Sequence, residues 1–168
     1  MFDIGELVMY GSEGVCRISG ICEENFGGAS ARYYELIPEY KANSSVLVPV
    51  DNEALTAKMH PLLTKSELDA LFDAIPDIPM QWIDNDNQRK ERYKQMLSSG
   101  DRSDLICIIK TLHQHRIDCV NRGRKLHAAD ERFFAQAADK LHSEIAAILG
   151  ITPDEAESYM VNRMEKLN

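Results

Sequence analysis

Two features of membrane and exported proteins are missing from this sequence. No apolar run approaches the roughly 18 residues that a helix needs to span a bilayer. The first residues, MFDIGELVMYG, contain no basic stretch followed by an apolar one, so they do not resemble a signal peptide. The sequence therefore predicts a cytoplasmic protein with no membrane partner.

The usual patterns of metal sites and catalytic sites are missing as well. None of the four cysteines lies in a C-x-x-C pair, which argues against a zinc site and favours free buried thiols. His113 and His115 would point about 200° apart on a helix and could not share an ion. We find no G-x-G-x-x-G loop, no G-x-S-x-G turn and no H-E-x-x-H motif. We expect no enzyme activity, no cofactor, no metal and no small-molecule substrate; a deep polar pocket would reopen the enzyme hypothesis.

Charge, by contrast, is plentiful and unevenly placed. The net charge of the 168 residues is −8. Residues 1–80 carry 13 acidic and 5 basic side chains, whereas residues 81–168 carry 14 of each. Within the second half, segment 89–125 has ten basic and four acidic side chains. This asymmetry favours two different partners, one of which is a candidate polyanion.

The first fifty or so residues predict a small β-structure, either a barrel or a sheet. β-Rich runs separated by turn signals predict strands at 7–10, 14–22, 32–38 and 44–50, with a glycine-containing turn at 24–30 and a loop at 39–43. Pro49 lacks the donor of a ladder hydrogen bond, so the last strand should lie at an edge or end there. A free edge and the side chains of Val46, Leu47 and Val48 are therefore candidates for binding a partner.

The remaining sequence predicts helices. Thr64 and Glu67 form a capping-box pattern, and the following helix is broken by the linker IPDIP at 75–79. A helix is expected at 84–98, ending before Gly100, and the next one begins at a cap formed by Asp101 or Ser103. A further helix is expected at 128–149, ending before Gly150, and the last follows the N-terminal signature Thr152-Pro153-Asp154-Glu155. We predict three parts: a β-domain at 1–57, a linking helix and linker at 58–80, and a helical domain at 81–168.

Apolar stripes indicate which helix faces form the core. The predicted inward residues are 105, 108, 109, 112, 119 and 120 of the third helix, Phe134, Ala137, Ala138, Leu141, Ile145, Ile148 and Leu149 of the fourth, and Ala156, Tyr159, Met160 and Leu167 of the last. Arg116 interrupts the stripe of the third helix. It is either a ligand contact or a structural side chain paired with a carboxylate such as Glu131.

The only tryptophan, Trp82, stands just before a basic helix. Arg89, Lys90, Arg92 and Lys94 lie on that helix, and a second cluster, NRGRK, follows at 121–125. A helix so polar all round is either a solvated spacer or a partner surface. Cations at a helix end suit the helix dipole, and the two clusters could also form one phosphate-binding surface.

Several segments together resemble one known family. FDIGELVMYGSEGVCRISGI is similar to the opening of the CarD/CdnL bacterial transcription regulators, written F-x-x-G-D-x-V-V-Y-P-x-H-G-V-G-x-I. YYEL and VLVPVDN resemble the third and closing strands of that family. SSGDRSDLICIIKTLHQHR and DERFFAQAADKLHSEIAAILGI resemble its helical module. The resemblance covers nearly the whole chain, although Leu47 replaces a basic residue found in some members and Trp82 stands farther from Gly100-Asp101 than the family tryptophan often does.

The resemblance implies an α+β protein, with a small N-terminal Tudor-like β-barrel followed by an all-α helical bundle. The barrel would dock on the β subunit of bacterial RNA polymerase, and a related module serves the transcription–repair coupling factor. The candidate polymerase-binding residues are Tyr33, Tyr34, Val46, Leu47, Val48 and Pro49. The helical domain would lie on promoter DNA at the upstream edge of the bubble, with a tryptophan as a wedge, and would modulate open-complex stability without a cofactor. The candidate DNA-binding residues are Trp82, Arg89, Lys90, Arg92, Lys94, Arg122, Arg124 and Lys125.

These observations leave two functions in competition. The leading hypothesis is a nucleoid-associated, non-enzymatic regulator that binds polymerase and, weakly and largely independently of sequence, promoter DNA. The alternative is an adaptor that binds polymerase through its barrel and another protein through its helical domain. Trp82 is correspondingly either a partly exposed DNA wedge or a packing residue between the two modules, with its indole N–H bonded to a backbone carbonyl.

Overall fold

The computed structural model describes residues 1–11, 13–41 and 43–166, and the chain divides into two compact units at Leu62/Leu63. Unit 1 is the β-domain and unit 2 is the helical domain, and each is described by itself. The predicted linking segment at 58–80 is not a separate part. Strand β5 (Met59–Pro61) belongs to the sheet, and helix α2 (Lys65–Ala74) belongs to the helical unit.

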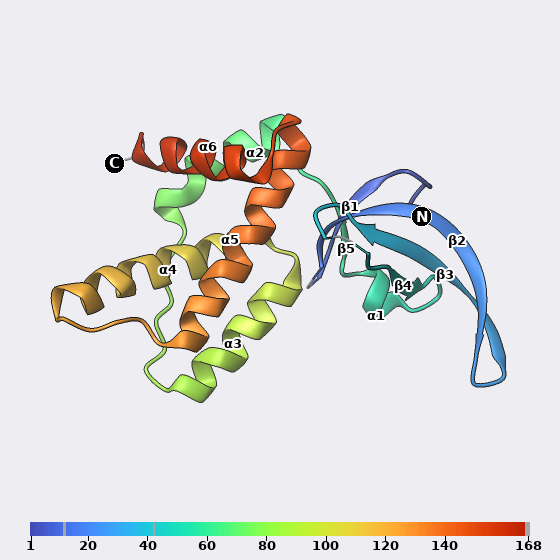
Figure 1. Cartoon of the computed structure of the whole chain (residues 1–168), viewed down its shortest axis with the longest axis horizontal. Helices are drawn as coiled ribbons and strands as arrows, with labels where there is room; N and C mark the ends of the chain where they lie inside the picture. Colours follow the sequence, from blue (N-terminus) through green and yellow to red (C-terminus); the bar gives the residue numbers. More distant parts are fainter. Residues whose placement is uncertain (12, 42, 167–168) are drawn as a thin grey trace. The chain divides into compact units, whose positions relative to one another are not determined.

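Within the described residues of unit 1, five strands form one antiparallel sheet in the order β4-β3-β2-β1-β5 (Figure 1). Its strands are β1 (Leu7–Tyr10), β2 (Gly14–Phe26), β3 (Ala29–Pro38), β4 (Val46–Pro49) and β5, with the short helix α1 (Glu53–Thr56) between the last two. The predicted barrel is not closed, because β4 and β5 lie at opposite edges of the order. Pro49 does lie in an edge strand, as its missing N–H requires.

The hairpin of β2 and β3 is longer than the sequence pattern predicts, and it extends well beyond the other strands (Figure 1). The predicted turn at 24–30 shrinks to two residues, because Phe26 pairs directly with Ala29. Gly27 and Gly28 have φ angles of 70° and 90°, which only glycine adopts readily and which suit a tight two-residue hairpin turn.

Alternation of side chains along the strands gives the sheet one buried face. Its core consists of Val8, Cys16, Ile18, Tyr34, Leu36, Val48 and Met59. The register pairs Tyr34 with Val48 and Leu36 with Val46, so the even-numbered residues of β4 point toward this core. Leu47 and Pro49, together with their partners Glu35 and Tyr33, point to the opposite face.

The helical unit contains α2, the 3₁₀ turn η1 (Ile75–Asp77), α3 (Asp86–Ser99), α4 (Arg102–Asn121), α5 (Ala128–Leu149) and α6 (Pro153–Glu165). Helix α5 packs against α3, α4 and α6, and also against α2, so it lies at the centre of this unit (Figure 1). The predicted stripes hold at Leu105, Ile108, Ile109 and Leu112 of α4, and at Ala137, Ala138, Leu141 and Ile145 of α5, all of which are buried.

Three details of the predicted core differ. Val120 is exposed and Cys119 is only half-buried, although both belong to the predicted stripe near the end of α4. Phe133, which the stripe omitted, is buried and meets the ring of Tyr93 edge-on at 5.7 Å. Leu167 lies outside the described residues.

The predicted helix ends are formed by the expected caps. The Thr64 and Thr152 side chains each close a capping box, with Glu67 and Glu155 respectively, and Pro153 occupies the first turn of α6. Asp101, rather than Ser103, caps α4 by accepting a hydrogen bond from the Ser103 amide. Gly100 and Gly150 end α3 and α5 in left-handed conformations.

A fully buried carboxylate ties the start of the helical unit to α5. Glu144 accepts two hydrogen bonds from Arg102 Nε and one of 2.7 Å from Arg102 Nη2. Its Oε1 also accepts a hydrogen bond of 3.1 Å from the Leu63 amide, directly after the boundary between the units. Because a buried charge is tolerated only when it is well paired, this cluster fixes both the start of α4 and the first residue of the unit.

Candidate polymerase and nucleic-acid interfaces

The predicted polymerase-binding residues divide between the two faces of the sheet. Tyr34 and Val48 are core residues, and Tyr34 also accepts a long hydrogen bond from the Phe2 amide at its hydroxyl. Their side chains are buried in the core and do not reach the outer face, so we include neither in the proposed contact. The sequence could have indicated that Tyr34 and Val48 differ from their neighbours, since adjacent residues of a strand point to opposite faces.

Val46 is half-buried and packs against the core, which leaves Tyr33, Leu47 and Pro49 as the accessible members of the predicted set. Tyr33 and Pro49 pair directly across β3 and β4 on the outer face. The ring of Phe26, which the sequence reasoning missed, meets Tyr33 edge-on at 5.5 Å and is exposed near the hairpin turn. We call Phe26, Tyr33, Leu47 and Pro49 the outer patch.

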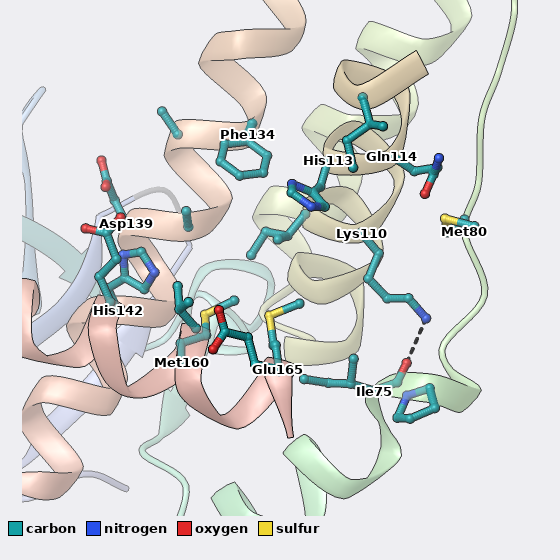
Figure 2. A pocket seen from close by; sticks show the side chains of 18 residues that line it. Ile75, Met80, Lys110, His113, Gln114, Phe134, Asp139, His142, Met160 and Glu165 are labelled. Carbon is teal, nitrogen blue, oxygen red and sulfur yellow. Dashed lines mark hydrogen bonds between the residues drawn. The ribbon is translucent and has the colours of Figure 1, made fainter. Parts of the chain in front are cut away.

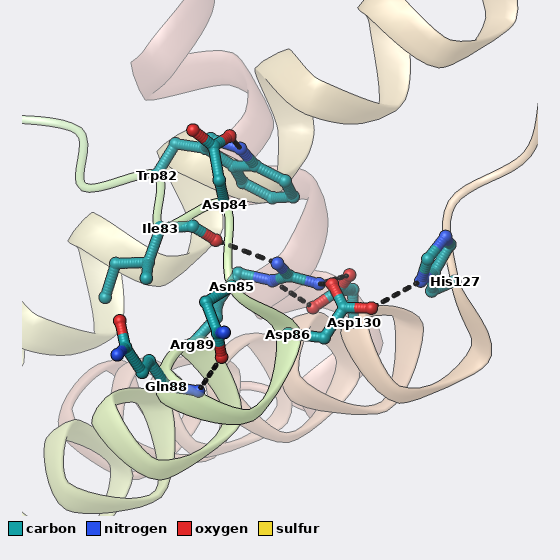
Figure 3. Close-up of polar contacts among 9 residues, drawn as sticks. All are labelled: Trp82, Ile83, Asp84, Asn85, Asp86, Gln88, Arg89, His127 and Asp130. Atoms are coloured by element: carbon teal, nitrogen blue, oxygen red, sulfur yellow. Dashed lines mark hydrogen bonds and ion pairs between the residues drawn. The ribbon is translucent and has the colours of Figure 1, made fainter.

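The first basic residue of the predicted DNA-binding helix is buried. Arg89 is 2 % exposed, and its guanidinium forms a bidentate pair with Asp130 of α5, at 3.0 Å from Nε and 2.8 Å from Nη2 (Figure 3). Nη2 also donates to Asp86, and Nη1 donates to the Ile83 carbonyl. With its donors engaged inside the unit, Arg89 is not placed to contact a phosphate, and we do not include it in the proposed DNA contact.

The electrostatics of this cluster favour the charged pair. Burial opposes the positive charge on Arg89, but hydrogen bonds to Asp130 and Asp86 outweigh that effect and raise its pKa. The same hydrogen bond to Asp86 lowers the pKa of the Asp86 carboxyl. Arg89 is therefore a structural connection between α3 and the first turn of α5.

Trp82 belongs to the same cluster. It is 38 % exposed, so the prediction of partial exposure is confirmed. Its ring stacks on His115 of α4, with centroids 3.6 Å apart and planes at 20°, and the Arg89 guanidinium carbon lies 4.3 Å from the ring centroid. The indole N–H donates to the Asp84 side chain at 2.9 Å, not to a backbone carbonyl (Figure 3).

The segment that carries Trp82 is attached along its length to the helical unit. Lys110 donates to the carbonyls of Ile75 and Ile78, and the Gln81 amide donates to Thr111. The hydroxyl of Tyr93 donates to the Gln81 carbonyl. Segment 75–83 is therefore not a linker between modules, and Trp82 packs within one unit.

The other predicted DNA-binding cations remain accessible. Arg92 and Lys94 of α3 are exposed and Lys90 is half-buried, while Arg122, Arg124 and Lys125 are exposed in the loop between α4 and α5. Within the part of the chain that the structure describes, none of these six forms an ion pair with a carboxylate. His127, at the end of that loop, lies 3.9 Å from Asp86 at the start of α3, so the loop approaches that helix end (Figure 3). We call these six residues the cation set.

Comparison with known proteins agrees with this arrangement. Residues 2–62 match the family model of the CarD-like/TRCF RID domain, and residues 71–161 match that of the CarD C-terminal domain. The chain belongs to the CarD-like family. This is a family of transcription factors that interact with RNA polymerase, and the N-terminal RID domain is Tudor-like in fold. A search of curated proteins found no match.

The family assignment places the outer patch in the CarD-like/TRCF RID domain and the cation set in the CarD C-terminal domain. Arg116, the other ambiguous cation, belongs to neither surface. It pairs with Glu131 at 2.7 Å and covers the ring of Phe134, with 4.3 Å between its guanidinium carbon and the centroid. The structural interpretation of Arg116 is thus correct.

The described residues of this CarD-like protein contain no group of three or more histidine, cysteine or acidic side chains placed to hold a metal ion. None of the helices in residues 1–11, 13–41 and 43–166 is long and apolar enough to cross a bilayer.

Proposed function

We propose that this CarD-like protein is a non-enzymatic regulator that docks on the β subunit of RNA polymerase and contacts promoter DNA near the upstream edge of the bubble. The contact modulates the lifetime of the open complex. The β-domain supplies the polymerase contact, and the helical domain supplies the DNA contact.

The observation that carries the DNA part is the cation set. In an acidic chain, cations that form no ion pair within the described residues are available to an external polyanion, and each phosphate they neutralise releases counterions. The two basic clusters lack the asparagine or glutamine spacing of a major-groove reader, so binding should be weak and largely independent of sequence. Non-specific affinity on the order of 10⁻⁴–10⁻⁶ M is expected at physiological salt.

The polymerase part rests on the edge strand β4 and the outer patch. Within the described residues, β4 pairs with β3 alone, so its other edge can accept a strand of a partner. Leu47 and Pro49 point away from the core beside that edge, where an apolar side chain of the partner strand can contact them. Tethering to polymerase raises the effective concentration of DNA at the cation set, so weak DNA affinity is sufficient.

The two contacts can be separated by mutating the full-length protein. Leu47→Glu should abolish capture of purified polymerase while binding to free duplex DNA and the melting temperature stay unchanged. Ile37→Glu is a matched control, since Ile37 is an exposed apolar residue of β3 beyond the end of its pairing with β4. A large drop in melting temperature for Leu47→Glu would instead show that Leu47 stabilises the β-domain, and normal capture would exclude the β4 edge.

The reciprocal variant reverses Lys90, Arg92 and Lys94 to glutamate. It should retain polymerase capture and lose most of the effect on open-complex lifetime. Loss of capture by this variant would contradict the division of labour between the domains.

A further inference from the structure

A groove of about 860 Å³ lies in the helical unit, between η1, α4, α5 and α6 (Figure 2). Its apolar lining comes from several elements and includes Ile117, Phe134, Ala138, Met160, Val161 and Met164. None of the cation set lines it. The groove is therefore separate from the surface proposed to contact DNA.

Part of this apolar lining faces solvent. Ile117 of α4 is 41 % exposed and Val161 of α6 is 48 % exposed, and Met80 is exposed as well. Single exposed apolar residues are ordinary, but three from three different segments around one groove form a contiguous apolar surface of the kind that binds a partner. Methionine is adaptable because its unbranched side chain fills irregular shapes, and Met80, Met160 and Met164 all lie here.

The charges at this groove are negative. Asp139, Glu157 and Glu165 line it, and none of them forms an ion pair within the residues that the structure describes. The ammonium group of Lys110 also lies there but donates to the Ile75 carbonyl at 2.8 Å (Figure 2) and to the Ile78 carbonyl at 2.6 Å. His113 and His142 line the groove as well, and burial lowers the pKa of His142, which favours its neutral form. An apolar floor with carboxylates and no available lysine or arginine repels nucleic acid and is complementary to a partner that is apolar and basic.

We propose that this groove binds an amphipathic helix of another protein, with aliphatic side chains in the groove and lysine or arginine side chains beside Asp139, Glu157 and Glu165. A helix suits the site because anchors at i, i+3 or i+4 and i+7 project along one face into such a groove. The interaction adds a second protein partner to the polymerase and DNA contacts proposed above, and it does not depend on either of them.

The direct test uses the full-length protein and a labelled synthetic helix with leucine anchors at these spacings and lysine flanks. Fluorescence anisotropy should show saturable binding that weakens as salt is added. Val161→Lys should lower the affinity at least about tenfold, because it places a like charge against the lysines within the apolar floor. Val120→Lys is the matched control: Val120 is 65 % exposed on α4 and lies outside the groove, so this change should have little effect.

Two further measurements identify what occupies the groove. The methyl NMR signals of Met160 and Met164 should shift on adding the lysine helix, and a helix with glutamate in place of lysine should bind much more weakly. Equal binding of the two helices, equal affinities of the Val161 and Val120 variants, or unchanged methyl signals would each overturn the proposal. So would a wild-type dimer in sedimentation that Val161→Lys dissociates, since a second copy would then fill the groove.

Discussion

Arg89 and Arg92 lie within one turn of the same helix, yet the structure gives them opposite roles. Arg89 faces α5 and forms a bidentate pair with Asp130, whereas Arg92 is exposed and has no carboxylate partner in the described residues. Local partners contribute to the difference, because Arg89 also donates to Asp86 and to the Ile83 carbonyl, but they do not account for its burial against α5. The pairing there is with a carboxylate forty-one positions later on another helix, so a count of positive charge along a helix does not identify a binding surface.

The largest expected effect comes from breaking the buried pair. Arg89→Met leaves Asp130 with an uncompensated buried charge, and such losses cost about 3–5 kcal/mol of unfolding free energy. Urea denaturation of the full-length protein, followed by the circular dichroism of the helices, measures this cost. A change of less than about 0.5 kcal/mol, typical of a surface substitution, would show that Arg89 is not structural.

A double variant sharpens the same result. Arg89→Met combined with Asp130→Leu replaces both charges by apolar groups of similar size, and it should recover much of the lost stability. We expect this recovery because Asp130→Leu removes the unpaired buried carboxylate that destabilises Arg89→Met. If the double variant is no more stable than Arg89→Met alone, the unpaired Asp130 carboxylate is not the source of the loss.

Trp82→Ala should have an intermediate effect. It removes the stack on His115 and the contact with the Arg89 guanidinium, interactions that each contribute about 0.5–1.5 kcal/mol. The loss should stay below the roughly 3–5 kcal/mol that truncation of a fully buried aromatic costs, because Trp82 is partly exposed. Trp82→Phe keeps a ring for the stack and loses only the bond to Asp84, so thermal unfolding should rank it between wild type and Trp82→Ala.

A smaller effect is expected from the pH dependence of Asp86. Its pKa is lowered from 3.8 by the hydrogen bond from Arg89, so its stabilising contribution is present above that ordinary value and disappears as pH falls through the lowered folded pKa. Wild type should therefore be more stable than Asp86→Asn at neutral pH, and the gap should close in acid. A gap that is constant with pH would mean that the Asp86 charge is not involved.

The smallest effect on stability should come from the exposed cations. Arg92→Ala and Lys94→Ala should each leave the unfolding free energy within about 0.5 kcal/mol of wild type. A larger loss in denaturant titrations would show that Arg92 and Lys94 stabilise the fold, as Arg89 is expected to do.

Much of the fold could be predicted from local sequence. Glycines at 100 and 150 and the threonine caps at 64 and 152 mark helix ends through interactions within a few residues, and all four are confirmed. Strand β5 was missed because it is only three residues long and includes a proline. Its strand conformation depends on pairing with β1, some fifty residues earlier, which no local pattern reveals.

The contacts of the candidate site residues were harder to predict, because they also depend on residues far away in the sequence. Leu47 and Pro49 were placed correctly at an edge because proline itself carries that information. Tyr34 lies in the core whereas Tyr33 lies on the outer face, and the period of two along a strand could have separated them. The contacts of Trp82 with His115 and of Arg89 with Asp130 join different helices, and their partners could not be identified without the tertiary structure.

The central claim is that the cation set, and not Arg89, contacts DNA. The most direct test is the slope of log affinity against log salt for the full-length protein on a labelled promoter duplex. Wild type should show a slope that corresponds to roughly four to six phosphate contacts. The slope should fall by the equivalent of about one contact in each of three variants, Arg92→Glu, Lys94→Glu and Arg122→Glu. Lys166→Glu, which lies outside the set, should leave the slope unchanged. A wild-type slope near zero, or equal changes for Lys166→Glu and the three set variants, would contradict the account and favour a helical domain that binds only protein.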